Sequence, residues 1–301
     1  MNTETTRSLL VHPKTDGPGM YHELSAQQAG WKHLGFGAQK LRRGQDWKHH
    51  TRDNELCIVL LGGKFSISSA WGEWITENSR ANVFGGLPHA AYLPPETEFV
   101  LTALSDEVDI AFGYAKGDTR YEGYFITPKR VHEYGIEFRG GDNASRQINS
   151  IIPPGSACSK LVCVEVYTPS GNWSSFPAHK HDTRVTDTTG KVKEAELEEI
   201  YFYKFDRPQG FALQKVYTDD RSLNEIAEPH MNDLVLIPRG YHPVAAGHGY
   251  TAYYLNFLAG SDQSLASTDD PQHKWIYGTW KKMDERLPIV SLDMNEGKSF
   301  Q

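Results

Sequence analysis

Short runs of strand-forming residues, each closed by turn residues, fill most of this chain and restrict its fold more than any other feature. The runs are rich in Val, Ile, Tyr and Phe and are bounded by Gly, Pro, Asn and Asp. With 27 Gly and 16 Pro among 301 residues, long helices are not expected. Many short strands with little helix between them predict an all-β sandwich or barrel. The strands expected are 55–61, 64–69, 98–104, 108–114, 160–168, 199–205, 210–217, 233–237 and 250–258.

These strands form two groups with a similar order of features. A polar, proline-containing stretch, 143–154, lies between them and suits a linker. The repeated features are Trp47, His49, His50, Glu55, Gly62–Gly63 and Pro94 in the first half, and Trp173, His179, His181, Glu199, Gly210 and Pro238 in the second. A repeat of this length indicates a duplicated barrel rather than a solenoid. We therefore predict one domain over residues 1–145 and a second over 146–301.

Charge and cysteine content exclude several classes of protein. The 31 basic and 38 acidic residues give a net charge of −7, without the basic stripe of a nucleic-acid-binding protein. No apolar run reaches the length of a membrane helix, and the start lacks the pattern of a secretory signal. Cys57, Cys158 and Cys163 lie in or beside apolar runs and form no metal motif. Buried free thiols, no membrane or nucleic-acid partner and a cytoplasmic location are expected.

A histidine cluster in the second half carries the clearest chemical signal. His179 and His181 are two residues apart, so on a strand they share one face. Glu199 opens an aromatic strand, although the neighbouring Glu198 is an alternative, and His242 follows the turn expected at 238–240. Three imidazoles and a carboxylate inside a barrel would suit a divalent transition metal with open positions for a ligand.

Two further features of the second half bear on this cavity. Tyr201 and Tyr203 alternate with Glu199 on the same face, so we expect them to line the cavity and limit water. The polar segment 182–198 is expected to form a long hairpin insertion, either a binding loop or a solvated excursion.

The first half does not offer a comparable set of ligands. His49 and His50 are adjacent, so on a strand they would point to opposite faces. His89 precedes the Pro94 turn and falls at no ligand position, and Glu55 is expected to be a solvated charge at a strand edge. The first barrel is therefore expected to be structural, without a complete metal site.

The His-x-His, later Glu and Pro-x-Gly motifs resemble those of the cupin superfamily. The gap from His181 to Glu199 is longer than usual, and His242 comes one residue early after Gly240. The segments 172–182, 198–217, 232–246 and 253–260 resemble the bacterial 5-deoxy-glucuronate isomerases of inositol catabolism, which are related to the 5-keto-4-deoxyuronate isomerases. The resemblance implies a bicupin, two tandem jelly-roll-like barrels.

The same resemblance implies a cofactor, a substrate and a reaction. The metal ligands would be His179, His181, Glu199 and His242, holding one divalent ion per chain, with Zn or Mn expected first and Fe or Ni as alternatives. The reaction would convert 5-deoxy-glucuronate into 2-deoxy-5-keto-gluconate, through an enediolate or, alternatively, a hydride shift. A homo-oligomer is expected, because a tandem barrel has sheet edges to cover.

The remaining roles are open at this point. His230 and Tyr254 are the candidates for proton transfer. The carboxylate of a sugar acid needs a cation, for which Arg239 is the first choice, with Arg184 and Lys180 as alternatives. Two other functions remain: an iron-dependent cupin dioxygenase, and a bicupin that binds sugar acids without catalysis.

Overall fold

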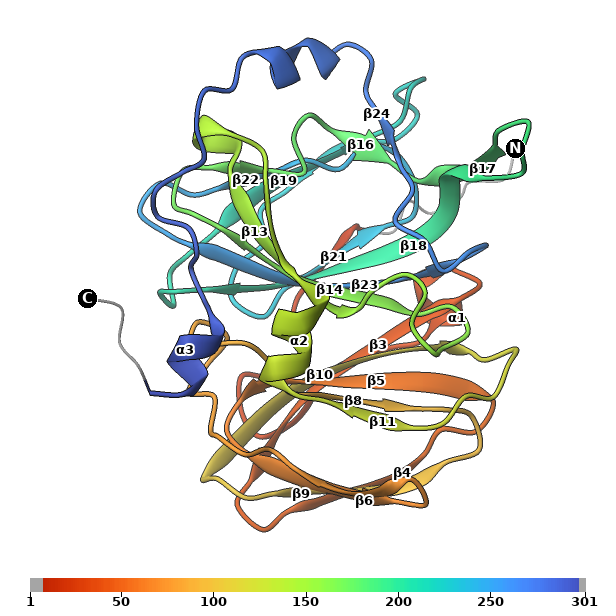
Figure 1. The fold of residues 1–301 in the computed structure, drawn as a ribbon, viewed down its shortest axis with the longest axis vertical. Coiled ribbons are helices and arrows are strands. Elements are labelled where there is room, and N and C mark those ends of the chain that lie inside the picture. The colour runs from red at the N-terminus through yellow and green to blue at the C-terminus, as the bar shows by residue number, and fades with distance from the viewer. Residues whose placement is uncertain (1–7, 298–301) are drawn as a thin grey trace.

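Two β-barrels with their larger sheets back to back make up the protein, as the computed structural model shows for residues 8–297 (Figure 1). All nine segments expected to be strands are strands, so the all-β prediction is confirmed. The helices are short: α1 (Ala26–Ala29), α2 (Pro128–Tyr134) and α3 (Leu292–Asn295), with 3-10 turns at Asp142–Ala144 and Lys274–Gly278. No helix in the described part of the chain is long and apolar enough to cross a membrane.

The first barrel consists of two antiparallel sheets. The larger has the order β11-β8-β5-β10-β3-β2 and the smaller β4-β9-β6-β7. The strands of the larger sheet are β2 (Gly19–Leu24), β3 (Leu34–Arg42), β5 (Asn54–Gly62), β8 (Ala90–Leu93), β10 (Glu107–Lys116) and β11 (Tyr124–Ile126). Those of the smaller are β4 (Asp46–His50), β6 (Phe65–Ser69), β7 (Gly72–Ile75) and β9 (Glu98–Ala103).

The second barrel repeats this arrangement with the order β1-β21-β18-β23-β14-β13-β12, and β17 pairs with β18. These strands are β1 (Leu10–Val11), β12 (Ile136–Arg139), β13 (Arg146–Ile152), β14 (Val162–Thr168), β17 (Asp182–Thr186), β18 (Val192–Phe205), β21 (Leu234–Ile237) and β23 (Ala252–Gly260). The facing sheet has the order β15-β22-β19-β20, from β15 (Trp173–Ser174), β19 (Ala212–Tyr217), β20 (Asn224–Ala227) and β22 (Val244–Ala246). A separate pair joins β16 (His179–Lys180) to β24 (Thr268–Asp269).

Three apolar clusters hold this arrangement together. One fills each barrel, and a third lies where the two larger sheets meet, with Phe36 of β3 packed on Phe202 of β18 and Phe257 of β23. A Cβ at Gly113 of β10 would run into the Phe257 ring, so this close approach requires glycine. Cys57, Cys158 and Cys163 are buried free thiols, as expected.

The segment 143–154 is not a linker. Residues 146–152 form β13, and every residue of it is buried. The sequence pattern does not predict this strand, because polar residues lie on both of its faces. Gln147 and Asn149 form buried hydrogen bonds on one face, and Arg146 and Ser150 line a cavity on the other. β1 and β12, which lie before residue 146, also pair within the sheet of the second barrel. The division at 145/146 stays a prediction.

Two glutamates connect the barrels in a reciprocal way. Glu198 of β18 accepts hydrogen bonds from the backbone N–H groups of residues 32, 33 and 34, where β3 begins, at 2.7–2.9 Å. Glu55 of β5 accepts three from residues 159, 160 and 161, before β14, and one from the Tyr92 hydroxyl. Glu55 is fully buried, so its expected role as a solvated edge charge is wrong.

Candidate active site

Three of the four expected metal ligands meet inside the second barrel. His181 follows β16, Glu199 lies on β18 opposite Ile237, and His242 follows the turn after β21. Gly240 has φ +88°, and a side chain there would run into the backbone of residue 217, so the turn that delivers His242 requires glycine. One ligand atom from each residue lies within 4.8 Å of the other two, and all three side chains are buried.

Backbone carbonyls orient both imidazoles of this group. His242 Nδ1 lies 2.8 Å from the Gly240 carbonyl oxygen. His181 Nδ1 lies 3.2 Å from the Leu197 carbonyl oxygen. Because a carbonyl only accepts, each Nδ1 carries the proton, and in a neutral ring each Nε2 presents its lone pair. This is the tautomer in which Nε2 can bind a metal.

Both Nε2 atoms face the same carboxylate oxygen. Glu199 Oε2 lies 2.9 Å from His181 Nε2 and 3.2 Å from His242 Nε2. His242 Nε2 is buried and forms no hydrogen bond within the described residues. A carboxylate also only accepts, so neutral rings would place three electron-rich atoms against one another. A divalent cation would satisfy all three atoms at once, and the group therefore fits a metal.

The charge states of these residues follow from burial and from their contacts. Burial favours a neutral Glu199, but the close contacts with His181 and His242 outweigh it and lower the pKa of Glu199 to about 2. Burial likewise opposes a proton on His181, yet the contact with Glu199 raises the pKa of His181 overall. Burial lowers the pKa of His179 well below its ordinary value, and the neighbouring His242 adds to this effect. Glu199 is thus ionised and His179 neutral near pH 7.

His179 lies beside this group rather than within it. Its ring centroid is 4.9 Å from that of His242 and 6.4 Å from that of His181. His179 lines the same cavity as His181 and Glu199. The structure thus brings all four expected residues together, and His179, His181 and Glu199 line the cavity while His242 lies behind them in contact with their side chains.

The cavity next to the group has a volume of about 330 Å³, a size suited to a small ligand. Of the expected aromatic residues, Tyr201 and Tyr254 line it, and their rings lie 4.7 Å apart. The Tyr254 hydroxyl forms a hydrogen bond with Ser174 Oγ. Tyr203 does not line the cavity, since its hydroxyl donates to Gln214 within the buried core.

The three expected carboxylate-binding cations lie elsewhere. Lys180 alternates with His179 and His181, so it points to the opposite face, where it pairs with Asp219 at 2.6 Å. Arg184 lies on the β17–β18 hairpin and pairs with Asp262 at 2.8 Å, and Arg239 is exposed at the tip of its turn. None of the three lines the cavity, so their expected substrate-binding role is not supported.

His230 also lies outside the cavity. Its side chain is 49% exposed, with Nε2 3.1 Å from Glu228 Oε1, and the residue opens the turn before β21. The long segment 182–198 forms the hairpin that was expected, with β17 paired to the start of β18.

Sequence reasoning missed two cations that line the cavity: Arg139, which pairs with Glu137, and Arg146. Arg146 lies at the start of β13, is 8% exposed and faces the same space as His179 and Tyr254. The signal for Arg146 is an arginine within a buried strand, which the polar, proline-containing sequence of 143–154 does not reveal. Trp280 and Tyr277, from the segment after β24, also line this cavity.

The first barrel differs at the matching positions. Leu56 of β5 pairs with Leu93, and Glu199 of β18 pairs with Ile237, in each case the last residue before a proline. Leu56 thus holds the place of Glu199 and offers no ligand atom. His49 is exposed beside Trp47 and Phe99. His50 and His89 have other contacts. His50 Nδ1 accepts a hydrogen bond from a backbone N–H, and His89 is buried against Phe125.

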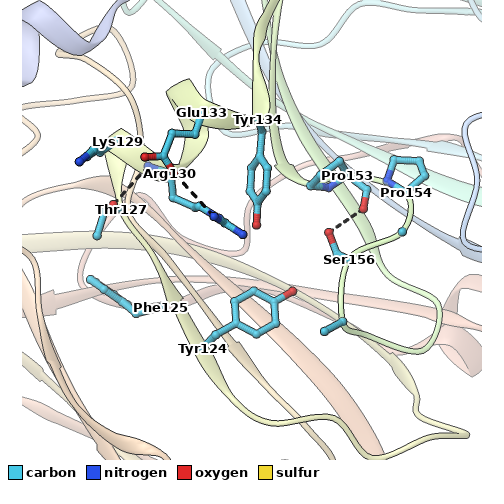
Figure 2. Close-up of a pocket in the computed structure, with 12 residues that line it drawn as sticks. Tyr124, Phe125, Thr127, Lys129, Arg130, Glu133, Tyr134, Pro153, Pro154 and Ser156 are labelled. Carbon is cyan, nitrogen blue, oxygen red and sulfur yellow. Dashed lines mark hydrogen bonds and ion pairs between the residues drawn. The ribbon is translucent and has the colours of Figure 1, made fainter.

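A larger hollow of about 700 Å³ lies between α2, β11 and the turn after β13 (Figure 2). Tyr124, Tyr134 and Pro153 line it, together with Arg130 and Glu133, which pair with each other at 3.6 Å. It contains none of the expected site residues.

Known proteins resemble this chain along most of its length. The 5-deoxy-glucuronate isomerase of Geobacillus kaustophilus is 39% identical over 272 residues, which cover 90% of this chain and 95% of that protein. The enzyme of the same name from Bacillus subtilis (strain 168) is 34% identical over 267 residues, covering 88% and 95%.

Solved structures agree with this likeness. An IolB-like protein from Salmonella typhimurium LT2 superimposes with a TM-score of 0.84 at 37% identity, covering 90% of this chain and 99% of that one. An oxalate decarboxylase from Bacillus subtilis matches with a TM-score of 0.58 at 11% identity, covering 86% and 77%, and so shares the bicupin fold alone. The family model described as KduI/IolB matches residues 9–276. This chain therefore belongs to the KduI/IolB family.

Proposed function

We propose that this protein is an aldose–ketose isomerase that converts 5-deoxy-D-glucuronate into 2-deoxy-5-keto-D-gluconate in myo-inositol catabolism. The observation that carries the proposal is the buried group of His181, Glu199 and His242 beside a cavity suited to a small ligand. Relatives named for this reaction, at 34–39% identity over about 90% of the chain, support the choice of substrate.

The reaction moves hydrogen between neighbouring carbons of the sugar acid. A proton leaves the hydroxyl-bearing carbon next to the aldehyde, and a proton is added to the former aldehyde carbon. The hydroxyl oxygen gives up its proton and becomes the ketone oxygen, while the former aldehyde oxygen gains a proton and becomes a hydroxyl. The difficulty is the negative charge that develops on the two oxygens in the enediolate. A divalent cation at the site would supply Lewis-acid chemistry, which stabilises that charge.

The protein's own residues prepare the site for this chemistry. His181, Glu199 and His242 form the cation site, and His179 is the proposed fourth ligand. Backbone carbonyls fix the rings of His181 and His242, so little rearrangement is needed when the cation binds. Apolar residues around the cavity, among them Val164 and Leu258, limit water near the reacting carbons.

Tyr254 is the proposed proton-transfer residue. It lines the cavity, whereas His230, the other candidate, lies outside it. Burial raises the pKa of Tyr254, so the phenol is protonated near pH 7. It can therefore donate a hydrogen bond or a proton to a substrate oxygen, with Ser174 as its hydrogen-bonding neighbour.

An isotope experiment tests both the activity and its route. The protein, loaded with a divalent cation, is incubated with 5-deoxy-D-glucuronate in D₂O and the product is followed by NMR. Proton transfer predicts 2-deoxy-5-keto-D-gluconate with solvent deuterium on its hydroxymethyl carbon. Product without deuterium would indicate a hydride shift instead, and no product at all would refute the proposed function.

A further inference from the structure

Arg146 is a buried cation without a partner in the part of the chain that the structure describes. Its side chain projects from β13 on the same face as Ile148 and Ser150, and all three line the cavity of the second barrel. The residue is 8% exposed. Its guanidinium forms no ion pair or hydrogen bond with any residue between 8 and 297.

The carboxylates that line the same cavity are already engaged. Glu137 pairs with Arg139 at 2.6 Å, and Asp269 is hydrogen-bonded by Tyr277. Glu199 faces the two histidines of the cation site. Arg146 is thus the charged group of this cavity that still lacks a counter-charge.

Such an arrangement opposes folding unless a ligand completes it. An arginine stays protonated at physiological pH, and a buried charge without a partner is unfavourable. Burial lowers the pKa of Arg146, and the nearby Arg139 adds to this effect. A guanidinium fork matches the two oxygens of a carboxylate, so the missing partner is best supplied by an acid that enters the cavity.

We infer that Arg146 binds the carboxylate of the sugar acid, while the aldehyde end of the same molecule lies at His181, Glu199 and His242. This inference rests on the proposed function and assigns the residue that determines substrate specificity. Arg146 makes the site select a sugar acid over a neutral sugar of the same length. Arg146 thus has the carboxylate-binding role that the sequence suggests for Arg239, Arg184 and Lys180, which lie outside the cavity.

A pair of substrates tests this role. The values of kcat/KM for 5-deoxy-D-glucuronate and for its neutral counterpart 5-deoxy-D-glucose are measured with the wild type, with R146M and with the control R184M. R146M should lose about 10²- to 10³-fold with the acid, as expected when one partner of a buried charge pair is removed. It should change little with the neutral sugar. R184M should behave as the wild type, because Arg184 lies outside the cavity.

Stability separates this role from a structural one. Because Arg146 has no partner to lose, R146M should keep its metal content and melt at or above the wild-type temperature. If R146M retains the wild-type preference for the acid, or loses activity equally with both sugars, the inference is wrong.

A binding measurement keeps this inference separate from the proposed function. If the wild type turns over neither sugar, the proposed function fails, and calorimetry with D-glucuronate and D-glucose then decides the role of Arg146. Acid binding that is lost in R146M supports the inference, and acid binding that is equal in both proteins overturns it.

Discussion

Glu198 and Glu199 are consecutive residues of β18 whose carboxylates work on opposite faces of one sheet. Glu198 holds three backbone N–H groups of the first barrel, and Glu199 lies between His181 and His242 in the second. The period of two in a strand places the barrel connection and the proposed metal centre back to back. The position of the site is therefore tied directly to the packing of the two barrels.

Substitutions of Glu198 and of Glu199 should have different effects. Glu199→Gln should lose bound metal, because an amide is a weaker ligand than a carboxylate, and the fold should remain. Glu198→Gln should keep the metal but lower the free energy of unfolding by about 2 kcal/mol, since charge-assisted hydrogen bonds to the backbone are weakened. Elemental analysis and urea unfolding check the pair. Metal loss in Glu198→Gln with full metal in Glu199→Gln would reverse the assignment.

Glu55, on β5 of the first barrel, is predicted to stabilise the contact between the two barrels. Glu55→Gln should lower the free energy of unfolding by about 2–4 kcal/mol, because a fully buried carboxylate would be replaced among four donors that it now satisfies. Glu98→Gln, at an exposed position of β9, is the control and should change stability by less than about 0.5 kcal/mol. Denaturant unfolding of both variants decides this. Equal stability of the two would mean that Glu55 is not a structural link.

Substitution of His179 tests the site, and the same substitution of His230 is its control. His179→Ala should abolish isomerisation and weaken metal binding while the circular dichroism spectrum stays that of an all-β protein, because the residue lines the cavity beside His242. His230→Ala should retain turnover, since that side chain is largely exposed and paired with Glu228. Rate measurements and metal titration check both. Full activity of His179→Ala after exhaustive chelation would exclude metal-dependent catalysis.

Stability should decrease on acidification below pH 6.5 because of buried histidines, of which His89 is one and His22 another. His89 is 1% exposed, neither of its ring nitrogens has a partner among residues 8–297, and burial lowers its pKa to about 4. Between pH 6.5 and 4 the unfolded chain binds a proton that the folded protein does not, so the free energy of unfolding falls as pH falls. One group contributes at most about 1.4 kcal/mol per pH unit. His89→Phe should reduce this slope in urea unfolding at several pH values, and an unchanged slope would contradict the assignment.

Much of the fold was predictable because strand signals are local. Runs such as 55–61 and 250–258 have apolar residues on both faces and turn residues at both ends, and the cation site follows from the alternation of His179 and His181. Glu55 and β13 were not predictable in this way. Their polar side chains are satisfied by partners distant in sequence, such as the backbone of residues 159–161 and Val290. Arg146 could not be placed in the cavity from the sequence, because it lies on β13, which the pattern does not predict.

Anaerobic turnover of 5-deoxy-D-glucuronate by metal-stripped and reconstituted protein, followed by NMR, tests the central claim most directly. The stripped protein should be inactive, and one divalent ion per chain should restore formation of 2-deoxy-5-keto-D-gluconate without oxygen. Full turnover by the stripped protein, or activity that requires oxygen, would contradict a metal-assisted isomerase built on His181, Glu199 and His242.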